Sequence, residues 1–217
     1  MKKIIVFLIG LCITLNAYSQ SCLPEGIEFD SQAQIDSFSV NYPDCTQIEG
    51  NVTIYTSEWG DITNLNGLIV LTSIGGNLEI INNYYSTTSN LFSLTGLEGI
   101  ITIGGDLIIC NNSALTNLSG LDNLISVGGN LIIGNDEYGG NINLISLTGL
   151  ESLTEIGGDL YISNNDILAT LTGLDDLTTI GGSLYIGGNP ALTNIVSLGN
   201  LSDLGWNLYI NSNSSLT

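Results

Sequence analysis

Apolar residues recur in two registers along most of this chain. After each Gly-Gly pair, leucine or isoleucine alternates with other residues, as at Leu160 and Ile162, and alternation of period two predicts a strand with one buried face. Before each pair, an apolar residue stands at every third position, as at Leu171, Leu174 and Leu177. Glycine and β-branched residues fill the gaps, which disfavours a helix there. The pattern predicts a coil of short strands joined by corners.

The unit repeats at a fixed spacing. The pairs stand at 75–76, 104–105, 128–129, 157–158 and 181–182, with spacings of 29, 24, 29 and 24 residues. Degenerate copies at 49–50 and 205–206 give about seven turns with a basic period of 24 residues. A period in this range predicts a solenoid, in which each turn buries its apolar face against its neighbours.

Three sets of equivalent positions define each predicted turn. The inward leucines are Leu78, Leu107, Leu131, Leu160, Leu184 and Leu208, and the inward isoleucines are Ile80, Ile109, Ile133, Ile162, Ile186 and Ile210. Glycines eight residues before each pair, Gly67, Gly96, Gly120, Gly149 and Gly173, are expected at corners with positive φ or close backbone approach. Polar residues expected to stack at the opposite corner are Asn83, Asn112, Asn165, Asn189 and Asn213, with Asp136 in one turn.

The chain resembles the receptor L domain in "CTQIEGNVTIY" at 45–55 and in copies such as "IGGNLEI" and "IGGDLYI". In particular it resembles L-domain-like surface proteins of Bacteroidetes-type bacteria. The resemblance implies an all-β, right-handed parallel β-solenoid with a short N-terminal capping helix in "DSQAQIDSFSVNYPDC". Asp30 or Ser31 would be its N-cap, and Ile35 and Phe38 would face the coil.

The resemblance also implies a disulfide between Cys22 and Cys45, which bracket the capping segment. A leucine-rich repeat proper is the alternative fold, although its consensus has no Gly-Gly pair between the apolar positions. Here Ile156 stands four residues before Leu160, with Gly-Gly between them.

Residues 1–20 have the pattern of a secretory signal peptide. Lys2 and Lys3 precede an apolar run too short to span a membrane, and Ala17-Tyr18-Ser19 fits a cleavage site. A lipoprotein signal at Cys12 or Cys22 is the alternative. We expect a cap at 21–47 and a solenoid at 48–217, outside the cell or on its surface. The "SSLT" at 214–217 copies "SALT" at 113–116, so we expect the repeat array and any anchoring segment to continue beyond Thr217.

Charge excludes several function classes. Loss of residues 1–20 removes both lysines and keeps all 21 acidic residues, for a formal charge of −21 with no Lys, Arg or His. Nucleic acid and anionic membranes are therefore not expected partners, and the mature domain is not expected to insert into a membrane. Weak, nonspecific binding of divalent cations is expected, without a specific metal site or any cofactor.

Catalysis is not expected. Without His, Lys or Arg there is no Ser-His triad and no Schiff base. The acidic pairs Asp175-Asp176 and Asp136-Glu137 are sequence neighbours, whose side chains point in opposite directions in an extended chain. Cys110 reads as a tolerated, unpaired thiol on the outward face of a strand.

Two aromatic surfaces are candidates for ligand binding. The outward column of the strands reads Thr53, Glu79, Ile108, Ile132, Tyr161, Tyr185, Tyr209, so the last three side chains, the tyrosine strip, should stack. Insertions after the asparagine corner carry the second surface, the aromatic rim, comprising Trp59, Tyr84, Tyr85, Asp136, Glu137 and Tyr138. We expect a non-catalytic binding or adhesion module for a protein or a glycan. The alternatives are a structural spacer and a carbohydrate-active enzyme.

Overall fold

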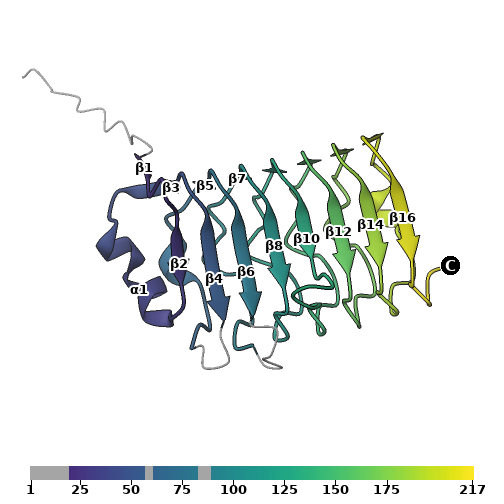
Figure 1. Cartoon of the computed structure of the whole chain (residues 1–217), viewed down its shortest axis with the longest axis horizontal. Helices are drawn as coiled ribbons and strands as arrows, with labels where there is room; N and C mark the ends of the chain where they lie inside the picture. The colour runs from purple at the N-terminus through teal and green to yellow at the C-terminus, as the bar shows by residue number, and fades with distance from the viewer. Residues whose placement is uncertain (1–19, 57–60, 83–88) are drawn as a thin grey trace, which may run out of the picture.

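Two parallel eight-stranded sheets run the length of the molecule in the computed structural model, which describes residues 20–56, 61–82 and 89–217. The short-strand sheet comprises β1 (Gln20–Cys22), β3 (Cys45–Ile48), β5 (Ser73–Ile74), β7 (Thr102–Ile103), β9 (Ser126–Val127), β11 (Glu155–Ile156), β13 (Thr179–Ile180) and β15 (Asp203–Leu204). The long-strand sheet comprises β2 (Ile27–Phe29), β4 (Val52–Thr56), β6 (Leu78–Asn82), β8 (Leu107–Cys110), β10 (Leu131–Ile133), β12 (Leu160–Ser163), β14 (Leu184–Gly187) and β16 (Leu208–Asn211) (Figure 1).

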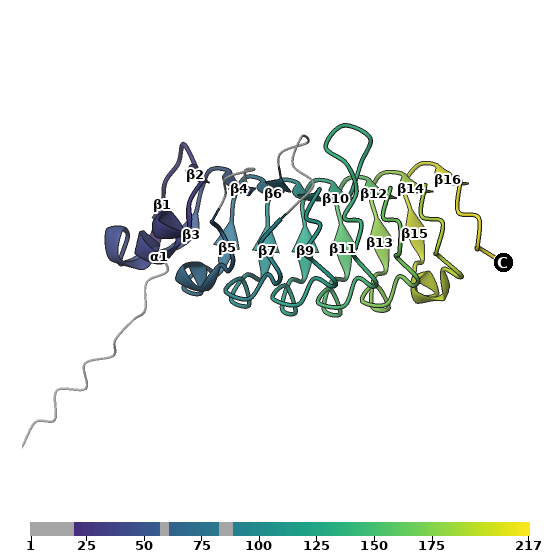
Figure 2. The same cartoon turned by 90° about the horizontal axis from the view of Figure 1, so that it is seen from below.

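The chain is a parallel β-solenoid of about seven turns, as its repeat predicts. Each turn contributes one strand to each sheet, so neighbouring strands in a sheet belong to consecutive turns. A third side closes each turn without a strand, and in two turns it contains a 3₁₀ helix, η1 (Asn66–Leu68) or η2 (Val196–Leu198) (Figure 2). Two strands per repeat distinguish this fold from a leucine-rich repeat proper, which has one.

The core is a stack of equivalent aliphatic layers. The inward leucines and isoleucines of the long-strand sheet pair rung on rung, with Leu131 opposite Leu160 and Ile133 opposite Ile162. These residues are fully buried except in the last turn, where Leu208 and Ile210 of β16 are exposed. Each fully buried aliphatic side chain contributes roughly 1.5–3 kcal/mol. Because neighbouring turns supply the buried contacts, stacking stabilises the coil and an isolated turn would not be stable.

The predicted capping helix is α1 (Gln32–Asn41), with Ser31 as its N-cap. The Gln34 side-chain oxygen accepts hydrogen bonds from the backbone N–H groups of Asp30 (2.7 Å) and Ser31 (3.2 Å). Ile35 and Phe38 are buried against the coil, as predicted. The N-terminal segment also contributes strands that the sequence pattern does not predict. β1 and β2 pair in parallel with β3 and β4, and α1 forms the third side of this first rung.

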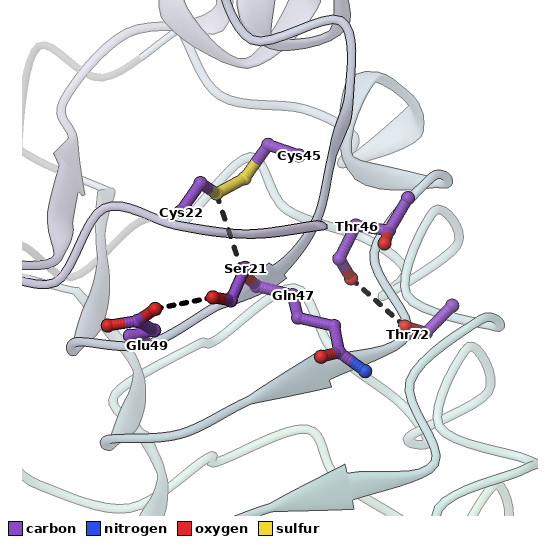
Figure 3. The surroundings of a disulfide bond; sticks show 7 residues. All are labelled: Ser21, Cys22, Cys45, Thr46, Gln47, Glu49 and Thr72. Atoms are coloured by element: carbon purple, nitrogen blue, oxygen red, sulfur yellow. Dashed lines mark hydrogen bonds between the residues drawn. A yellow bond between two sulfur atoms is a disulfide. The ribbon is translucent and has the colours of Figure 1, made fainter. Parts of the chain in front are cut away.

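The predicted disulfide links Cys22 of β1 to Cys45 of β3, with Cα atoms 5.6 Å apart (Figure 3). It therefore joins two neighbouring strands of the short-strand sheet. Beside it, the Ser21 hydroxyl donates to the Glu49 carboxylate. The next rung is tied in by Thr72, whose hydroxyl donates to the Thr46 carbonyl oxygen at 3.0 Å. The first turns are thus held by a covalent bond in addition to the backbone hydrogen bonds between their strands.

Corner glycines confirm the expected backbone requirement. Positive φ values occur at Gly96 (+111°), Gly120 (+115°), Gly149 (+109°) and Gly173 (+113°). The fifth member, Gly67, has no positive φ, but a Cβ there would collide with the carbonyl oxygen of Ile35 in α1. Both reasons for glycine, conformation and close approach, therefore apply in this set.

A buried asparagine ladder, the corner ladder, occupies the opposite corner and corrects one prediction. Asp136 is exposed and takes no part in it, because the insertion precedes the corner in that turn and Asn141 holds the position. The ladder consists of Asn112, Asn141, Asn165, Asn189 and Asn213. Each backbone N–H from Asn112 to Asn189 donates to the side-chain oxygen of the next rung, at 3.0–3.1 Å. Asn83 lies outside the described residues.

A second polar ladder, the Gly-Gly ladder, was not predicted. It consists of the residues that follow the five Gly-Gly pairs and the degenerate pair at 49–50, namely Asn51, Asn77, Asp106, Asn130, Asp159 and Ser183. Here the side-chain oxygen of one rung accepts from the backbone N–H of the next, at 2.6–2.9 Å. The signal was present as Asn, Asp or Ser after every pair, but the change of residue type hid it.

Candidate functional site

The tyrosine strip forms as predicted. Tyr161, Tyr185 and Tyr209 pair directly across β12, β14 and β16. The rings of Tyr161 and Tyr185 lie 4.3 Å apart with an interplanar angle of 4°, and those of Tyr185 and Tyr209 lie 4.5 Å apart at 10°. Both faces of the Tyr185 ring are therefore covered, and it presents only its edge and hydroxyl to a ligand. Ile108 and Ile132, expected to extend an exposed patch, are half-buried.

The Gly-Gly ladder orients the first ring of the tyrosine strip. The Tyr161 hydroxyl donates to Asp159 Oδ2 at 3.3 Å, while Asp159 Oδ1 accepts from the Ser183 backbone N–H at 2.6 Å. Burial, the neighbouring Tyr185 hydroxyl and the Asp159 carboxylate together raise the pKa of Tyr161. The Tyr161 ring thus leans toward the Gly-Gly corner, away from the other end of its strand, which leaves the small residues there uncovered.

The uncovered space is a groove of about 390 Å³, the tyrosine groove. Its lining residues are Asp136, Tyr161, Ser163, Asn164, Tyr185, Ile186, Gly187, Gly188, Asn211 and Ser212. The tyrosine rings form one side, and the small residues Ser163 and Gly187 lie between them and the corner. The groove crosses three consecutive turns, because Ser163, Gly187 and Asn211 are register partners.

Left-handed residues shape the corner side of the groove. Asn164 has φ +60°, Gly188 +65° and Ser212 +54°, each immediately before a residue of the corner ladder. A Cβ at Gly188 would lie 2.5 Å from Asn164 Oδ1, so glycine allows the Asn164 side chain to sit there. These positions were not singled out from the sequence, since asparagine, glycine and serine alternate in them.

Asp136 enters the groove from the insertion that follows β10, which projects from the edge of the coil (Figure 2). Asn135 and Gly139 close this loop with an antiparallel bridge, and Asn135 Oδ1 accepts from the backbone N–H groups of Glu137 (3.1 Å) and Tyr138 (2.7 Å). Asn164 Nδ2 donates to Asp136 Oδ1 at 2.6 Å. The structure thus brings one residue of the predicted aromatic rim to the predicted tyrosine strip.

The other rim residues that the structure describes, Glu137 and Tyr138, do not join the groove. Glu137 is exposed and Tyr138 is partly buried, and neither lines the groove. Partial desolvation and the Glu137 and Glu79 carboxylates raise the pKa of Tyr138. Trp59, Tyr84 and Tyr85 lie outside the described residues. The described insertion precedes its corner asparagine, rather than following it as predicted.

The other adjacent acidic pair, Asp175-Asp176, lies outside the groove. Asp175 accepts from the backbone N–H of the corner glycine Gly173 at 3.1 Å, and both Asp175 and Asp176 are exposed. Glu98, Asp122 and Glu151 accept from the equivalent glycines of the preceding turns. Within the described part of the chain, no group of three acidic, histidine or cysteine residues is arranged to hold a metal ion.

Cys110 is the free cysteine of the described chain and is buried, although its position in β8 faces outward. Desolvation raises the pKa of its thiol to about 12. A protonated, inaccessible thiol is a poor nucleophile and a poor metal ligand.

A second hollow, of about 660 Å³, lies on the strandless side and was not predicted. It is lined by Ser89, Phe92, Ser113, Ala114, Thr116, Ile142, Asn143, Ile145 and Ile167. The Phe92 side chain is 67% exposed, which makes the hollow a shallow apolar surface. It lacks the convergent polar groups that orient a ligand in the tyrosine groove.

Comparisons of this chain with family models, with curated proteins and with solved structures give no match. None of the helices in the described ranges is long and apolar enough to cross a membrane.

Proposed function

We propose that this chain is a non-catalytic binding module of a secreted or cell-surface protein, and that the tyrosine groove is its ligand site. The observation that carries the proposal is the meeting of the Tyr161–Tyr185 stack and Asp136 in one groove. Rigid aromatic side chains with a few oriented polar groups are typical of recognition surfaces, because they provide contact area at low entropic cost.

Secretion is supported by the signal-like pattern of residues 1–20 and by the Cys22–Cys45 disulfide, since disulfides persist in oxidising compartments. The motifs at 45–55 and the Gly-Gly copies support a relationship to receptor L domains and to Bacteroidetes-type surface proteins. A role in adhesion is supported by the solenoid architecture, in which each outward position recurs once per turn and forms an extended surface.

The proposal is tested by binding of the purified chain to an array of neutral, acidic and amino-bearing oligosaccharides. Gly187→Leu places a bulky side chain on the groove floor, where the nearest atom to a new Cβ is Asn211 Oδ1 at 3.1 Å. Gly199→Leu is the matched control, because Gly199 is exposed on the strandless side, away from the groove.

We expect at least one oligosaccharide to bind the native chain and the Gly199→Leu control, and to lose about tenfold or more in affinity with Gly187→Leu. Circular dichroism establishes that both variants fold. Equal binding by both variants would place recognition elsewhere. No binding to any array member would favour the structural spacer.

A further inference from the structure

The ionised groups at the tyrosine groove are all carboxylates. Asp136 lines the groove, and Asp159 lies beside the strip, where it accepts from Tyr161. The sequence contains two cationic residues in total, Lys2 and Lys3, and no histidine. An anionic ligand would therefore meet an unbalanced negative potential, whereas a cationic ligand would be attracted to it.

Asp136 has a free acceptor at a fixed place. Its Oδ1 is held by Asn164 Nδ2 at 2.6 Å, and its Oδ2 has no hydrogen-bond partner within the described part of the chain. The Asn135–Gly139 bridge holds the loop that carries it. A protonated amine is the ligand group that fits an oriented carboxylate oxygen, since charge-assisted hydrogen bonds are about twice as strong as neutral ones.

The remaining polar groups of the groove are neutral. Ser163, Asn164, Asn211 and Ser212 offer hydroxyl and amide groups, and the tyrosines offer ring edges. Ile186 points into the core, so apart from the rings no apolar side chain forms a pocket for the anchor residue of a peptide. Strands β12 and β14 are paired on both sides, so an extended peptide cannot add to the sheet there. These features favour a polyhydroxylated ligand over a peptide.

The groove also favours a chain over a single sugar. It crosses three rungs, and rungs are about 4.8 Å apart, so it spans roughly 10 Å along the solenoid axis. Hydroxyl and amide groups recur on alternate rungs, at Ser163 and Asn211 on either side of Gly187. A linear saccharide lying along the axis would meet them in turn.

We propose that the tyrosine groove binds an amino-bearing saccharide chain, with a protonated amine against Asp136. The inference rests on the proposed function and specifies its ligand class. The probes are the hexamer of β-1,4-linked glucosamine and its N-acetylated counterpart, which share a backbone and differ in charge. Titration calorimetry is done at a mildly acidic pH that protonates the free amines.

Two matched variants separate the site from general electrostatic attraction. Asp136→Asn removes the charge while keeping an oxygen that can accept from Asn164. Asp203→Asn removes one charge from the exposed short-strand sheet, away from the groove. Both variants make the net charge less negative by the same amount, so the long-range attraction of a cationic ligand changes equally.

We expect the glucosamine hexamer to bind about tenfold or more tighter than the N-acetylated hexamer, and Asp136→Asn, not Asp203→Asn, to abolish that preference. Equal affinity for the two hexamers, blocked by Gly187→Leu, would overturn the amine preference and leave the binding module standing. Equal losses of this preference in the two aspartate variants would show that it comes from the overall charge of the protein, and would overturn the proposed contact with Asp136. Absence of binding by the glucosamine hexamer would also overturn it.

Discussion

Tyr161 and Tyr185 occupy the same place on consecutive rungs, with ring centroids 4.3 Å apart and planes within 4° of parallel. Tyr185 stacks on Tyr209 in the same way, at 4.5 Å. Tyr185 is therefore the member of the strip with a tyrosine on each side.

Replacing Tyr185 with alanine should destabilise the coil more than replacing Tyr209. Tyr185 takes part in two stacked pairs, each worth about 0.5–1.5 kcal/mol beyond burial, and Tyr209 in one. We expect Tyr185→Ala to lower the free energy of unfolding by about 1–3 kcal/mol and Tyr209→Ala by about half as much. Urea denaturation followed by circular dichroism measures both. Equal losses in the two variants would show that stacking is not what the tyrosines contribute.

The corner ladder should be far more sensitive than exposed asparagines. Asn165 Nδ2 donates to the carbonyl oxygens of Ile133 (2.9 Å) and Ser163 (3.0 Å), and its Oδ1 accepts from the Asn141 backbone N–H (3.0 Å). Asn165→Ala leaves these groups without partners, at about 1–3 kcal/mol for each buried group.

We therefore expect a loss of at least about 3 kcal/mol for Asn165→Ala, against less than about 0.5 kcal/mol for the exposed control Asn66→Ala. Chemical denaturation of the two variants checks this. A loss near the control value would mean that water replaces the ladder without cost.

The Cys22–Cys45 disulfide should stabilise the N-terminal rungs. It closes a loop with a sequence separation of 23 residues, for which the chain-entropy estimate is about 3 kcal/mol. Peptide mapping without reductant should recover the linked peptides, and replacing both cysteines with serine should lower the unfolding free energy by about that amount. Alkylation of both thiols in native, unreduced protein would contradict the assignment.

Cys110 should resist alkylation in the native state. Burial raises the pKa of its thiol to about 12, whereas an unfolded chain ionises near the ordinary cysteine value of about 8.5. At pH 9 we expect iodoacetamide to modify the denatured protein rapidly and the native protein at least about a hundredfold more slowly.

The raised pKa of Cys110 also makes the free energy of unfolding depend on pH. Since the native state holds the proton more tightly, the contribution of Cys110 is fully present below the unfolded pKa and is lost as the pH rises toward about 12. Tyrosines titrate in this range too, so the comparison is with Cys110→Ala. The difference in unfolding free energy between the native sequence and Cys110→Ala should shrink between about pH 8.5 and 12. A difference that stays constant over this range would contradict a buried thiol with a raised pKa.

The repeat pattern was sufficient to predict the coil and the register of its strands. Alternation around Leu160 and Ile162 distinguishes inward from outward positions, and constant spacing then stacks Tyr161 on Tyr185. These features follow from period and burial, which equivalent residues in successive turns share.

Features at the insertions could not be derived in the same way. Counting from Gly128 places Asp136 at the asparagine corner, but the five extra residues precede that corner, and Asn141 occupies it. The spacing between successive Gly-Gly pairs gives the length of an insertion, but it does not tell whether the insertion precedes or follows the corner. For the same reason, the contact between Asp136 and Asn164, which joins rim to strip, was not foreseeable.

The site in the tyrosine groove is tested most directly by nuclear magnetic resonance on protein labelled with ¹³C-tyrosine. During titration with the glucosamine hexamer, we expect the ring signals of Tyr161 and Tyr185 to shift to saturation, while Tyr42, which packs on Phe38 in the N-terminal cap, stays in place. Shifts confined to tyrosines outside the groove, or none at any tyrosine, would contradict the account.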